Sequence, residues 1–489
     1  MSDIFGTQAR LPYSTGLIWS YCLENKVIRE NYNLSNWFWY KDNSNSVENI
    51  LKKLDEPAVL GLATFIWNWK FNSALCKKVK EKWPNCLIVI GGWQPPMADR
   101  SQGFFENYPF FDIIVHGEGE EAFKDILLEN LKTEKSWENI KGCSIPFKLV
   151  LDKDNCETAK IKDGLKLEKT EKIKNPKNLT TYVTEPRKRI DDLQPMPSPY
   201  LNGLFDELIK DCKYDIEGTI ETTRGCPFGC TFCEIGTKYY QKIKTHGEAK
   251  IFREIDWLSK NKAAFIYNAD SNFGMLPEHV AIAEYLVKKK KETGYPEKHR
   301  CDWAKVHGDK VIQIAKILYK SGLESGITIA LQSLNPKTLE AVKRKNMDDG
   351  KLSEFLNKYN DDELASFTEI ILGLPEETLE SFSKGICKVI ELGQHDYVGI
   401  NELIALPNTP FGDPEYRKKY GLNLVETWPS FVHVDNSNQR DEVEQMVIGS
   451  NTMSVNDYKE AMMFKWLVLF GHYLGTIQYV ARFLRNYKN

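Results

Sequence analysis

Residues 58–131 alternate between short apolar runs and segments whose apolar residues recur at helical spacing. The runs Ala58 to Thr64 and Leu87 to Ile90 have the continuous apolar character of strands buried on both faces. Between them, apolar residues recur every three or four positions, as on one buried face of a helix, at Phe71, Ala74, Leu75 and Val79. Asp112 to Val115 predicts a further strand before a second such helix. This alternation predicts a doubly wound α/β, Rossmann-like domain.

A second and longer alternation of strands and helices begins at Glu217. Helical patterns fit between six apolar runs, which predict strands at 218–223, 263–269, 300–306, 326–331, 365–372 and 398–406. Six βα units predict a partial (β/α)6 barrel of the TIM type. In such barrels the chemistry lies on loops at the carboxyl ends of the strands.

These patterns divide the chain into four expected parts. They are a Rossmann-like domain with irregular, lysine-rich trim at 1–185, a linker at 186–216, the barrel at 217–420 and a helical C-terminal region at 421–489. The linker contains three prolines between Leu193 and Tyr200, which favour an extended chain. The first strand of the amino-terminal domain should precede Leu11, where only Ile4 and Phe5 are apolar. Either this strand is very short or the start codon has been placed late.

Composition and charge narrow the possible classes. With 489 residues, 42% of them hydrophobic, the chain can bury two or three cores, and no apolar run approaches the roughly 20 residues of a membrane span. The amino terminus lacks the pattern of a signal peptide, so we expect a cytoplasmic protein. A net charge of -3, with both signs interspersed, offers no basic surface for nucleic acid.

Three of the eleven cysteines lie within eight residues of one another. Cys226, Cys230 and Cys233 have C-x3-C-x2-C spacing and follow the first predicted barrel strand. Iron–sulfur cubanes normally take four cysteines, so three cysteines leave one iron open to an exogenous ligand. A zinc site would need a fourth Cys or His, commonly in a second close pair, and no such pair lies nearby. We therefore predict that the three thiols hold a 4Fe-4S cluster.

The segment Arg224-Gly-Cys-Pro-Phe-Gly-Cys-Thr-Phe-Cys233 resembles the signature of the radical S-adenosylmethionine (SAM) superfamily, C-x3-C-x-aromatic-C, with Phe232 as the aromatic residue. The resemblance covers Glu217 to Gly412. It implies that the open iron binds the amino and carboxylate groups of SAM, and that one electron cleaves SAM to a 5'-deoxyadenosyl radical. It also implies a flavodoxin- or ferredoxin-type electron donor, because no internal low-potential donor is visible.

The same resemblance assigns SAM contacts to the ends of other predicted strands. The residues after the second strand would face the methionyl ammonium, those after the fourth would bind ribose or carboxylate, and an arginine on the next helix would pair with the carboxylate. For each position, an ordinary turn or surface role is the alternative. The expected SAM-binding residues are Phe232, Asn268, Asp270, Gln332, Ser333, Arg344 and Leu406.

A doubly wound domain ahead of such a barrel resembles the cobalamin-dependent branch of the superfamily. The matching segments are Leu11-Pro-Tyr-Ser-Thr-Gly16, Gly91-Gly-Trp-Gln-Pro95 and His116-Gly-Glu-Gly-Glu120. The Asp-x-His-x-x-Gly motif that places a histidine on cobalt is missing, so the resemblance implies cobalamin without a histidine ligand. Trp67 or Trp69 would cover the lower face of cobalt, unless both are core residues. The expected cobalamin-binding residues are Trp67, Gly91, Gly92, Gln94, Gly117 and Gly119.

These resemblances imply a cobalamin-dependent radical SAM methyltransferase that acts on an unactivated carbon of a peptide or secondary-metabolite scaffold. One alternative keeps cobalamin but carries out an oxidative cyclisation or rearrangement without methyl transfer. Another is a non-catalytic cobalamin or iron–sulfur carrier, although an electron carrier should close its fourth iron site. The substrate pocket is not predicted beyond candidates at the barrel mouth, namely Tyr239, Tyr240, Asp302 and Trp303.

Overall fold

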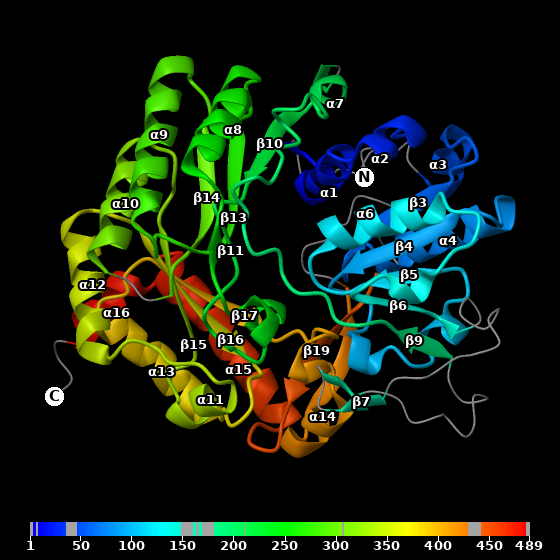
Figure 1. The fold of residues 1–489 in the computed structure, drawn as a ribbon. Helices are drawn as coiled ribbons and strands as arrows, with labels where there is room; N and C mark the ends of the chain where they lie inside the picture. Colours follow the sequence, from blue (N-terminus) through cyan, green and yellow to red (C-terminus); the bar gives the residue numbers. More distant parts are fainter. Residues whose placement is uncertain are drawn as a thin grey trace. The chain divides into compact units, whose positions relative to one another are not determined.

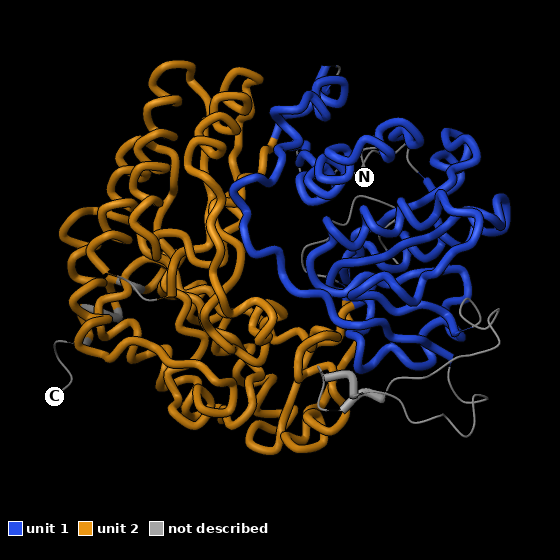
Figure 2. Tube along the Cα trace, in the orientation of Figure 1, with its two compact units in different colours: residues 1–216, 428–443 blue, residues 217–427, 444–489 orange. Residues whose placement is uncertain are grey.

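The computed structural model describes residues 3–5, 8–35, 46–147, 160–162, 166–168, 180–210, 212–305, 308–428 and 442–485. The chain divides into two compact units (Figure 2). Unit 1 comprises Met1–Ile216 and Trp428–Val443, and unit 2 comprises Glu217–Thr427 and Glu444–Asn489. Much of the trim expected at 134–185 lies outside the described residues.

Unit 1 is built on a five-stranded sheet in the order β3-β4-β5-β6-β9 (Figure 1). The first three strands in this order are parallel, and the last two pair antiparallel with their neighbours. The strands are β3 (Val59–Thr64), β4 (Leu87–Gly92), β5 (Ile113–Val115), β6 (Cys143–Pro146) and β9 (Thr181–Val183).

Helices cover both faces of this sheet, as the apolar runs predicted. Ile88 and Ile90 of β4 lie in one core with Leu75 of helix α4 (Trp69–Lys82). The alternate residues Leu87 and Val89 lie in a second core with Ile126 of helix α6 (Gly119–Asn130). Because successive residues of a strand point to opposite faces, β4 must be apolar at every position. The predicted doubly wound sheet is confirmed.

The residues before Leu11 form a short antiparallel hairpin of β1 (Asp3–Phe5) and β2 (Gln8–Arg10). In the sheet of unit 1 as described, β3 is an edge strand. The expected central first strand is therefore not part of that sheet. The other elements of unit 1 are α1 (Tyr13–Leu23), α2 (Lys26–Asn31), α3 (Val47–Lys53), η1 (Ala98–Arg100), α5 (Phe104–Asn107), η2 (Trp137–Asn139), β7 (Lys160–Lys162), β8 (Lys166–Glu168) and α7 (Asp206–Lys210).

The segment 186–216, expected as a linker, belongs to unit 1. Tyr200 and Phe205 are both fully buried, and the ring of Tyr200 stacks 5.7 Å from that of Tyr13 in α1. A Cβ added to Gly16 of the same helix would lie 2.5 Å from the Phe205 ring. The prolines do keep this segment irregular, but its aromatic side chains anchor it to the core.

Residues from the end of the chain complete unit 1. The carboxylate of Glu442 accepts hydrogen bonds from the backbone N of Lys70 at 3.0 Å and of Phe71 at 2.9 Å, in the first turn of α4. The preceding residue, Asn68, does not cap this helix with its side chain. Glu442 therefore supplies the acceptor that the first turn of a helix needs.

Unit 2 contains six parallel strands in two sets of three (Figure 1). The first set is β10 (Asp215–Ile220), β13 (Phe265–Phe273) and β14 (Lys298–Trp303), and the second is β15 (Ile327–Gln332), β16 (Ser366–Leu372) and β17 (Tyr397–Glu402). Each coincides, to within a few residues, with a predicted strand. The helices between them are α8 (Glu248–Lys260), α9 (Glu278–Thr293), α10 (Asp309–Lys320), α11 (Pro336–Ala341), α12 (Asp349–Asp361) and α13 (Leu379–Glu391). The partial barrel is confirmed.

The region 421–489, expected to be mostly helical, contains the helices α15 (Val455–Val468) and α16 (Gln478–Arg485) and also a pair of strands. Strands β18 (Asn423–Thr427) and β19 (Glu444–Gly449) pair antiparallel, and Val447 N donates to Leu403 O at 2.9 Å. Neither strand is buried at every position, so no apolar run reveals them. The remaining elements of unit 2 are β11 (Thr223–Arg224), η5 (Glu234–Gly236), η6 (Lys238–Tyr240), β12 (Lys244–Thr245), η7 (Pro410–Gly412), α14 (Pro414–Tyr420) and the π-helical turn η8 (Leu469–Tyr473).

Among the described residues, no helix is both long enough and apolar enough to cross a bilayer.

Candidate active site

The three cysteines lie on one loop that follows β10. Cys226 and Cys230 are buried and Cys233 is half-buried. The loop folds back on itself, because Cys226 N donates to Tyr240 O at 2.9 Å and Cys233 N donates to Cys230 O at 3.2 Å. Gly225 has φ +116°, and a Cβ there would lie 2.6 Å from two carbonyl oxygens. The loop therefore requires glycine at this position.

A buried carboxylate fixes the entry to this loop. Asp270 accepts hydrogen bonds from the backbone N of Thr222 and of Thr223, both at 2.8 Å, and from the Thr222 hydroxyl. Burial raises the pKa of Asp270 to about 7, although these hydrogen bonds oppose the rise. Asn268 Oδ1 in turn accepts from Asp270 N at 2.9 Å. Both residues were expected to contact SAM. Both are fully buried, and they support the cysteine loop through these hydrogen bonds to its first residues.

A second carboxylate holds the other side of the entry. Glu221 accepts from Arg224 Nε at 2.9 Å and Nη2 at 2.8 Å, and it lies 3.0 Å from His246 Nε2. Burial opposes ionisation here, but Arg224 and His246 hold the pKa of Glu221 well below its usual value. The residue before Gly225 is thereby fixed by a bidentate ion pair.

Three nitrogen donors approach the cysteine sulfurs from outside the loop, one on β13, one just after β14 and one in the loop after α11. Arg344 lies in this last loop, and not on the helix where it was expected. Asn272 Nδ2 lies 3.2 Å from Cys226 Sγ. Lys305 Nζ and Arg344 Nη1 lie 3.7 Å and 3.8 Å from Cys230 Sγ. Of these three residues, only Arg344 was predicted from the sequence. Asn272 and Lys305 lie at or just after the ends of predicted strands, and this position is the only feature of the sequence that could have indicated them.

The remaining candidates for SAM contact occupy the ends of β15 and β17 and the loop itself. Gln332 has a left-handed φ of +68°, and the Ser333 hydroxyl hydrogen-bonds to the Glu377 carboxylate. Arg344 also donates to Ala330 O and to Asn346 Oδ1, so the guanidinium has a fixed direction. Phe232 packs against a buried cluster formed by Val342, Leu374, Leu403, Ala405, Phe411 and Val447, and Leu406 is half-buried just after Ala405.

The barrel-mouth candidates differ in where they point. Asp302 is exposed and accepts from the Tyr267 hydroxyl at 2.9 Å, whereas its neighbour Trp303 is buried against Phe273. Desolvation raises the pKa of Asp302 above its usual value, and the hydrogen bond from Tyr267 opposes this rise. Tyr239 and Tyr240 contact each other edge to face, 4.8 Å apart.

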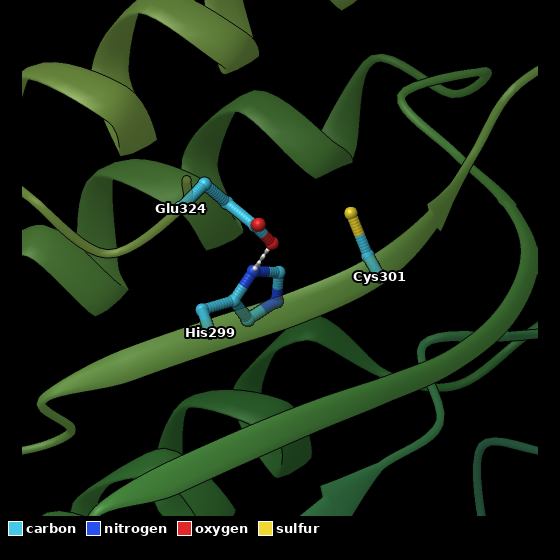
Figure 3. Close-up of side chains that lie close together, drawn as sticks. All are labelled: His299, Cys301 and Glu324. Atoms are coloured by element: carbon cyan, nitrogen blue, oxygen red, sulfur yellow. Dashed lines mark hydrogen bonds and ion pairs between the residues drawn. The ribbon is translucent and has the colours of Figure 1, made fainter. Parts of the chain in front are cut away.

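A separate group of potential metal ligands lies on the outer face of β14. Figure 3 shows His299 and Cys301 on that strand beside Glu324, and one ligand atom from each lies within 4.8 Å of the others. His299 Nδ1 and Glu324 Oε1 are 2.9 Å apart, so these two atoms already form a hydrogen bond. Burial raises the pKa of the Cys301 thiol well above its usual value. We interpret the group as a link between β14 and the turn after α10.

In unit 1, the candidate cobalamin residues gather at the carboxyl edge of the parallel strands. Gly92 has φ +93°, and a Cβ there would lie 2.4 Å from Thr64 O. Gln94 N donates to the same oxygen at 3.1 Å, and Gln94 Oε1 is buried without a hydrogen-bond partner among the described residues. Gly117 has φ +80°, and Gly119 begins α6 where a Cβ would lie 2.9 Å from Ile18. Gly92 and Gly119 are thus required by the close approach of Thr64 and Ile18.

The side chains of His116, Trp67 and Trp69 near this edge differ in whether they are free to contact a ligand. His116 Nε2 lies 2.7 Å from Ser144 Oγ, and burial lowers the pKa of His116 to about 4. Trp67 is 38% exposed and stacks on Phe65 at 4.6 Å, with the rings 4° from parallel. Trp69, in contrast, packs into the core against Phe104, Tyr108 and Phe111.

Residues 220–384 match the family model described as the Radical SAM superfamily. This range holds the cysteine loop and most of the barrel. Residues 220–384 are therefore a radical SAM domain, as the C-x3-C-x2-C spacing predicted.

Two curated relatives align with 97% of the chain. TokK of Streptomyces tokunonensis, named a cobalamin-dependent radical SAM methyltransferase, is 31% identical over 481 residues. The 2-(S-pantetheinyl)-carbapenam-3-carboxylate methyltransferase of Streptantibioticus cattleyicolor is 30% identical over 481 residues. The chain spans 65% of the length of each of these relatives. The chain is thus similar, over almost its whole length, to a cobalamin-dependent radical SAM methyltransferase.

Solved structures share the fold over most of the chain. OxsB, described as a cobalamin-dependent SAM radical enzyme with aqua-cobalamin and SAM bound, has a TM-score of 0.60, 16% identity and coverage of 96% of this chain and 66% of its own. TsrM from Kitasatospora setae has a TM-score of 0.57, 14% identity and coverage of 82% and 72%. The predicted combination of a Rossmann-like sheet and a radical SAM barrel is confirmed.

Proposed function

We propose that this chain is a cobalamin-dependent radical SAM methyltransferase that methylates an unactivated carbon of a peptide or secondary-metabolite scaffold. The observation that carries the proposal is the buried cysteine loop after β10, in a chain that aligns over 97% of its length with two named methyltransferases. We further propose that residues 1–216 with 428–443 form the cobalamin-binding domain, and that the rest forms the SAM-cleaving domain.

Cys226, Cys230 and Cys233 would hold the 4Fe-4S cluster. The donor set fits, because three thiols on one glycine-shaped loop leave one iron open and nitrogen donors face two of the sulfurs. When bound and reduced, such a cluster supplies the electron that cleaves SAM. The chain's own contribution is to fix the loop through Asp270 and Glu221 and to exclude water by burying Cys226 and Cys230.

Arg344 is the side chain best placed to hold the carboxylate of SAM. Its guanidinium is buried beside Cys230, and its other donors are fixed on Ala330 O and Asn346. Gln332, Ser333, Phe232 and Leu406 remain proposed contacts to the ribose and adenine. For Asn268 and Asp270 we propose support of the loop in place of direct contact, because both are fully buried.

Cobalamin would lie at the carboxyl edge of the sheet in unit 1. Four glycines lie at this edge, namely Gly91, Gly92, Gly117 and Gly119. The unpartnered Gln94 Oε1 there offers an acceptor to one of the peripheral amides of cobalamin. The exposed Trp67 would cover a ring face. Cobalamin supplies a carrier for the methyl group. His116 is hydrogen-bonded to Ser144 and is not proposed as a cobalt ligand.

The proposed partners are a flavodoxin- or ferredoxin-type electron donor and a small-molecule or peptide substrate. We place the protein in the cytoplasm, where such donors occur and thiols stay reduced. Ten cysteines lie in the described residues and all are free, which supports this location.

The proposal predicts a fixed stoichiometry. We expect the reconstituted protein, given SAM, a reductant, methylcobalamin and the carbapenam named for the second relative, to form S-adenosylhomocysteine, 5'-deoxyadenosine and product in equal amounts, since one SAM donates the methyl group and another gives the radical. Mass spectrometry should show a product heavier by one CH2 unit. The variant with Cys226, Cys230 and Cys233 replaced by Ala is the control and should form neither nucleoside.

Other outcomes separate the alternatives. A product without added methyl mass would identify an oxidative or rearranging enzyme. If no substrate from either scaffold class elicits 5'-deoxyadenosine, the carrier alternative holds and the proposed activity fails.

A further inference from the structure

Two polar side chains that lie on neighbouring strands of unit 2 point at the cysteine sulfurs from outside the loop. Asn272, near the end of β13, places Nδ2 3.2 Å from Cys226 Sγ. Lys305, just after β14, places Nζ 3.7 Å from Cys230 Sγ. The two are linked, because Lys305 N donates to Asn272 Oδ1 at 3.4 Å. Each strand thus contributes one N–H donor to one sulfur.

Within the described residues, Lys305 Nζ forms no ion pair with an Asp or Glu, although its charge does act on the carboxyl group of Asp302. Its Nζ instead lies 5.0 Å from the ring centroid of Phe228, which is part of the cysteine loop. Arg344 differs, because its guanidinium also donates to Ala330 O and Asn346 and is oriented by them. The side chain of the half-buried Lys305 is therefore oriented by its contacts with Phe228 and Cys230 of the cysteine loop.

An iron–sulfur cluster held by three thiolates becomes more negative by one charge when it is reduced. A nearby cation and N–H donors to sulfur stabilise the more negative state, and so they raise the reduction potential. A partly desolvated ammonium group a few ångströms from a ligating sulfur acts at short range, where screening by salt is weak.

From this arrangement we infer that Lys305, with Asn272 in support, raises the reduction potential of the cluster and brings it within reach of a flavodoxin- or ferredoxin-type donor. In this step the donor loses one electron and the cluster gains it, and no bond is made or broken. Both are positioning residues, since they act through the cysteine sulfurs. The inference rests on the proposed function only in requiring that Cys226, Cys230 and Cys233 hold the cluster.

The test compares midpoint potentials of anaerobically reconstituted full-length protein without SAM, cobalamin or substrate. Lys305→Met keeps the length of the side chain but removes its charge, Lys305→Arg keeps the charge, and Asn272→Leu removes the amide donor. Lys310→Met is the matched control, because Lys310 is an exposed lysine of α10. Potentiometric titration followed by electron paramagnetic resonance of the reduced cluster gives the midpoint.

We expect Lys305→Met to make reduction at least tenfold less favourable, which for a one-electron couple is a fall of about 59 mV. Asn272→Leu should lower the midpoint by less, Lys305→Arg should restore most of it, and Lys310→Met should match the wild type. A Lys305→Met protein with full iron content and an unchanged midpoint overturns the inference. The same result with weakened SAM binding also overturns it and assigns Lys305 to SAM.

If the Lys305→Met protein loses iron, the Asn272→Leu protein provides the test. A midpoint potential of Asn272→Leu below that of the wild type supports the inference, and an unchanged midpoint potential overturns it. These outcomes are distinct from failure of the proposed function. If the wild-type protein itself holds no cluster, it is the proposed function that fails, before any variant is compared.

Discussion

His116 follows the third parallel strand of unit 1, in a position where a histidine could be mistaken for a cobalt ligand. Its ring is hydrogen-bonded to Ser144 Oγ, which also contacts Ser101 Oγ at 3.0 Å. Burial lowers the pKa of His116 to about 4. At neutral pH the ring is therefore uncharged and already has a structural partner.

This low pKa predicts how stability depends on pH. The unfolded chain binds a proton at His116 near pH 6.5 and the folded chain only near pH 4, so His116 favours the folded state above pH 6.5 and this contribution is lost as pH falls towards 4. The loss is at most about 3 kcal/mol, from ~1.36 kcal/mol per pKa unit.

We expect His116→Gln to remove the part of the pH dependence of stability that arises from protonation of His116. Urea unfolding of the apoprotein at several pH values between 7 and 4 measures it, and the difference between wild type and variant cancels the other titrating groups. The wild type should lose more stability than the variant as pH falls. Parallel curves would show that His116 titrates normally in the folded protein.

At the scale of single residues, candidate ligands are easier to recognise in the sequence than the residues that support them. Cys226, Cys230 and Cys233 are recognisable because their spacing is local. Asp270 is different: its carboxylate was expected at SAM but serves Thr222 and Thr223, a pairing set by how β10 and β13 align. Lys305 could not be selected among many lysines, since only its position beside Cys230 distinguishes it.

Turning to elements, β3 and β4 meet at an unusually close backbone approach. Gly92 has φ +93°, and a Cβ there would lie 2.4 Å from Thr64 O and 2.8 Å from Thr64 N. Backbone atoms of a central sheet cannot give way as a flexible side chain can. This position therefore requires glycine for two separate reasons.

We expect Gly92→Ala to destabilise unit 1 by roughly 2 kcal/mol more than the control Gly103→Ala in the same unit. Gly103 also has a left-handed φ, +78°, but a Cβ there would meet only Glu106 Oε2, at 3.9 Å. Both substitutions are destabilising because alanine disfavours a left-handed φ. Only Gly92→Ala also brings the new Cβ into contact with the Thr64 backbone. Thermal unfolding measures the difference, and retention of cobalamin should fall with Gly92→Ala alone. Equal destabilisation by the two would mean that the Thr64 backbone can shift.

Elements with one strong local period were predictable and the others were not. The parallel strands of both units were found because most of them carry apolar runs, whereas β6 and β9 were not predicted. The pairing of β18 with β19 was missed, because neither strand is buried at every position. For the segment 186–216, expected as a linker, prolines predict irregular backbone, but they say nothing of the burial of Tyr200 and Phe205.

On the scale of the whole molecule, the two units are not consecutive in the chain. Unit 1 ends at Ile216 and resumes at Trp428–Val443, between the two strands of a hairpin that belongs to unit 2. Glu442, in the returning segment, caps the first turn of α4. The helix that begins beside the candidate residue Trp67 thus depends on a residue more than 350 positions later.

A fragment of residues 1–216 should therefore be less stable than the same fragment with 428–443 appended through a flexible linker. Loss of the charged cap predicts a difference of about 1–2 kcal/mol. Chemical unfolding of both fragments measures it, and the longer fragment with Glu442→Ala should behave like the shorter one. If the longer fragment gains nothing, the cap has no energetic role.

The position of Glu442 also limits how such a protein can be recombined. Suppose that residues 1–216 are replaced by the same segment of a related protein. The sheet and α4 would then come from the relative, while Glu442 would stay, so the new α4 would be capped by a residue from a different protein. A clean exchange of unit 1 needs three junctions, at 216, 427 and 443. The sequence of 428–443 should therefore change together with that of α4 when related chains diverge, although more than 340 residues separate them.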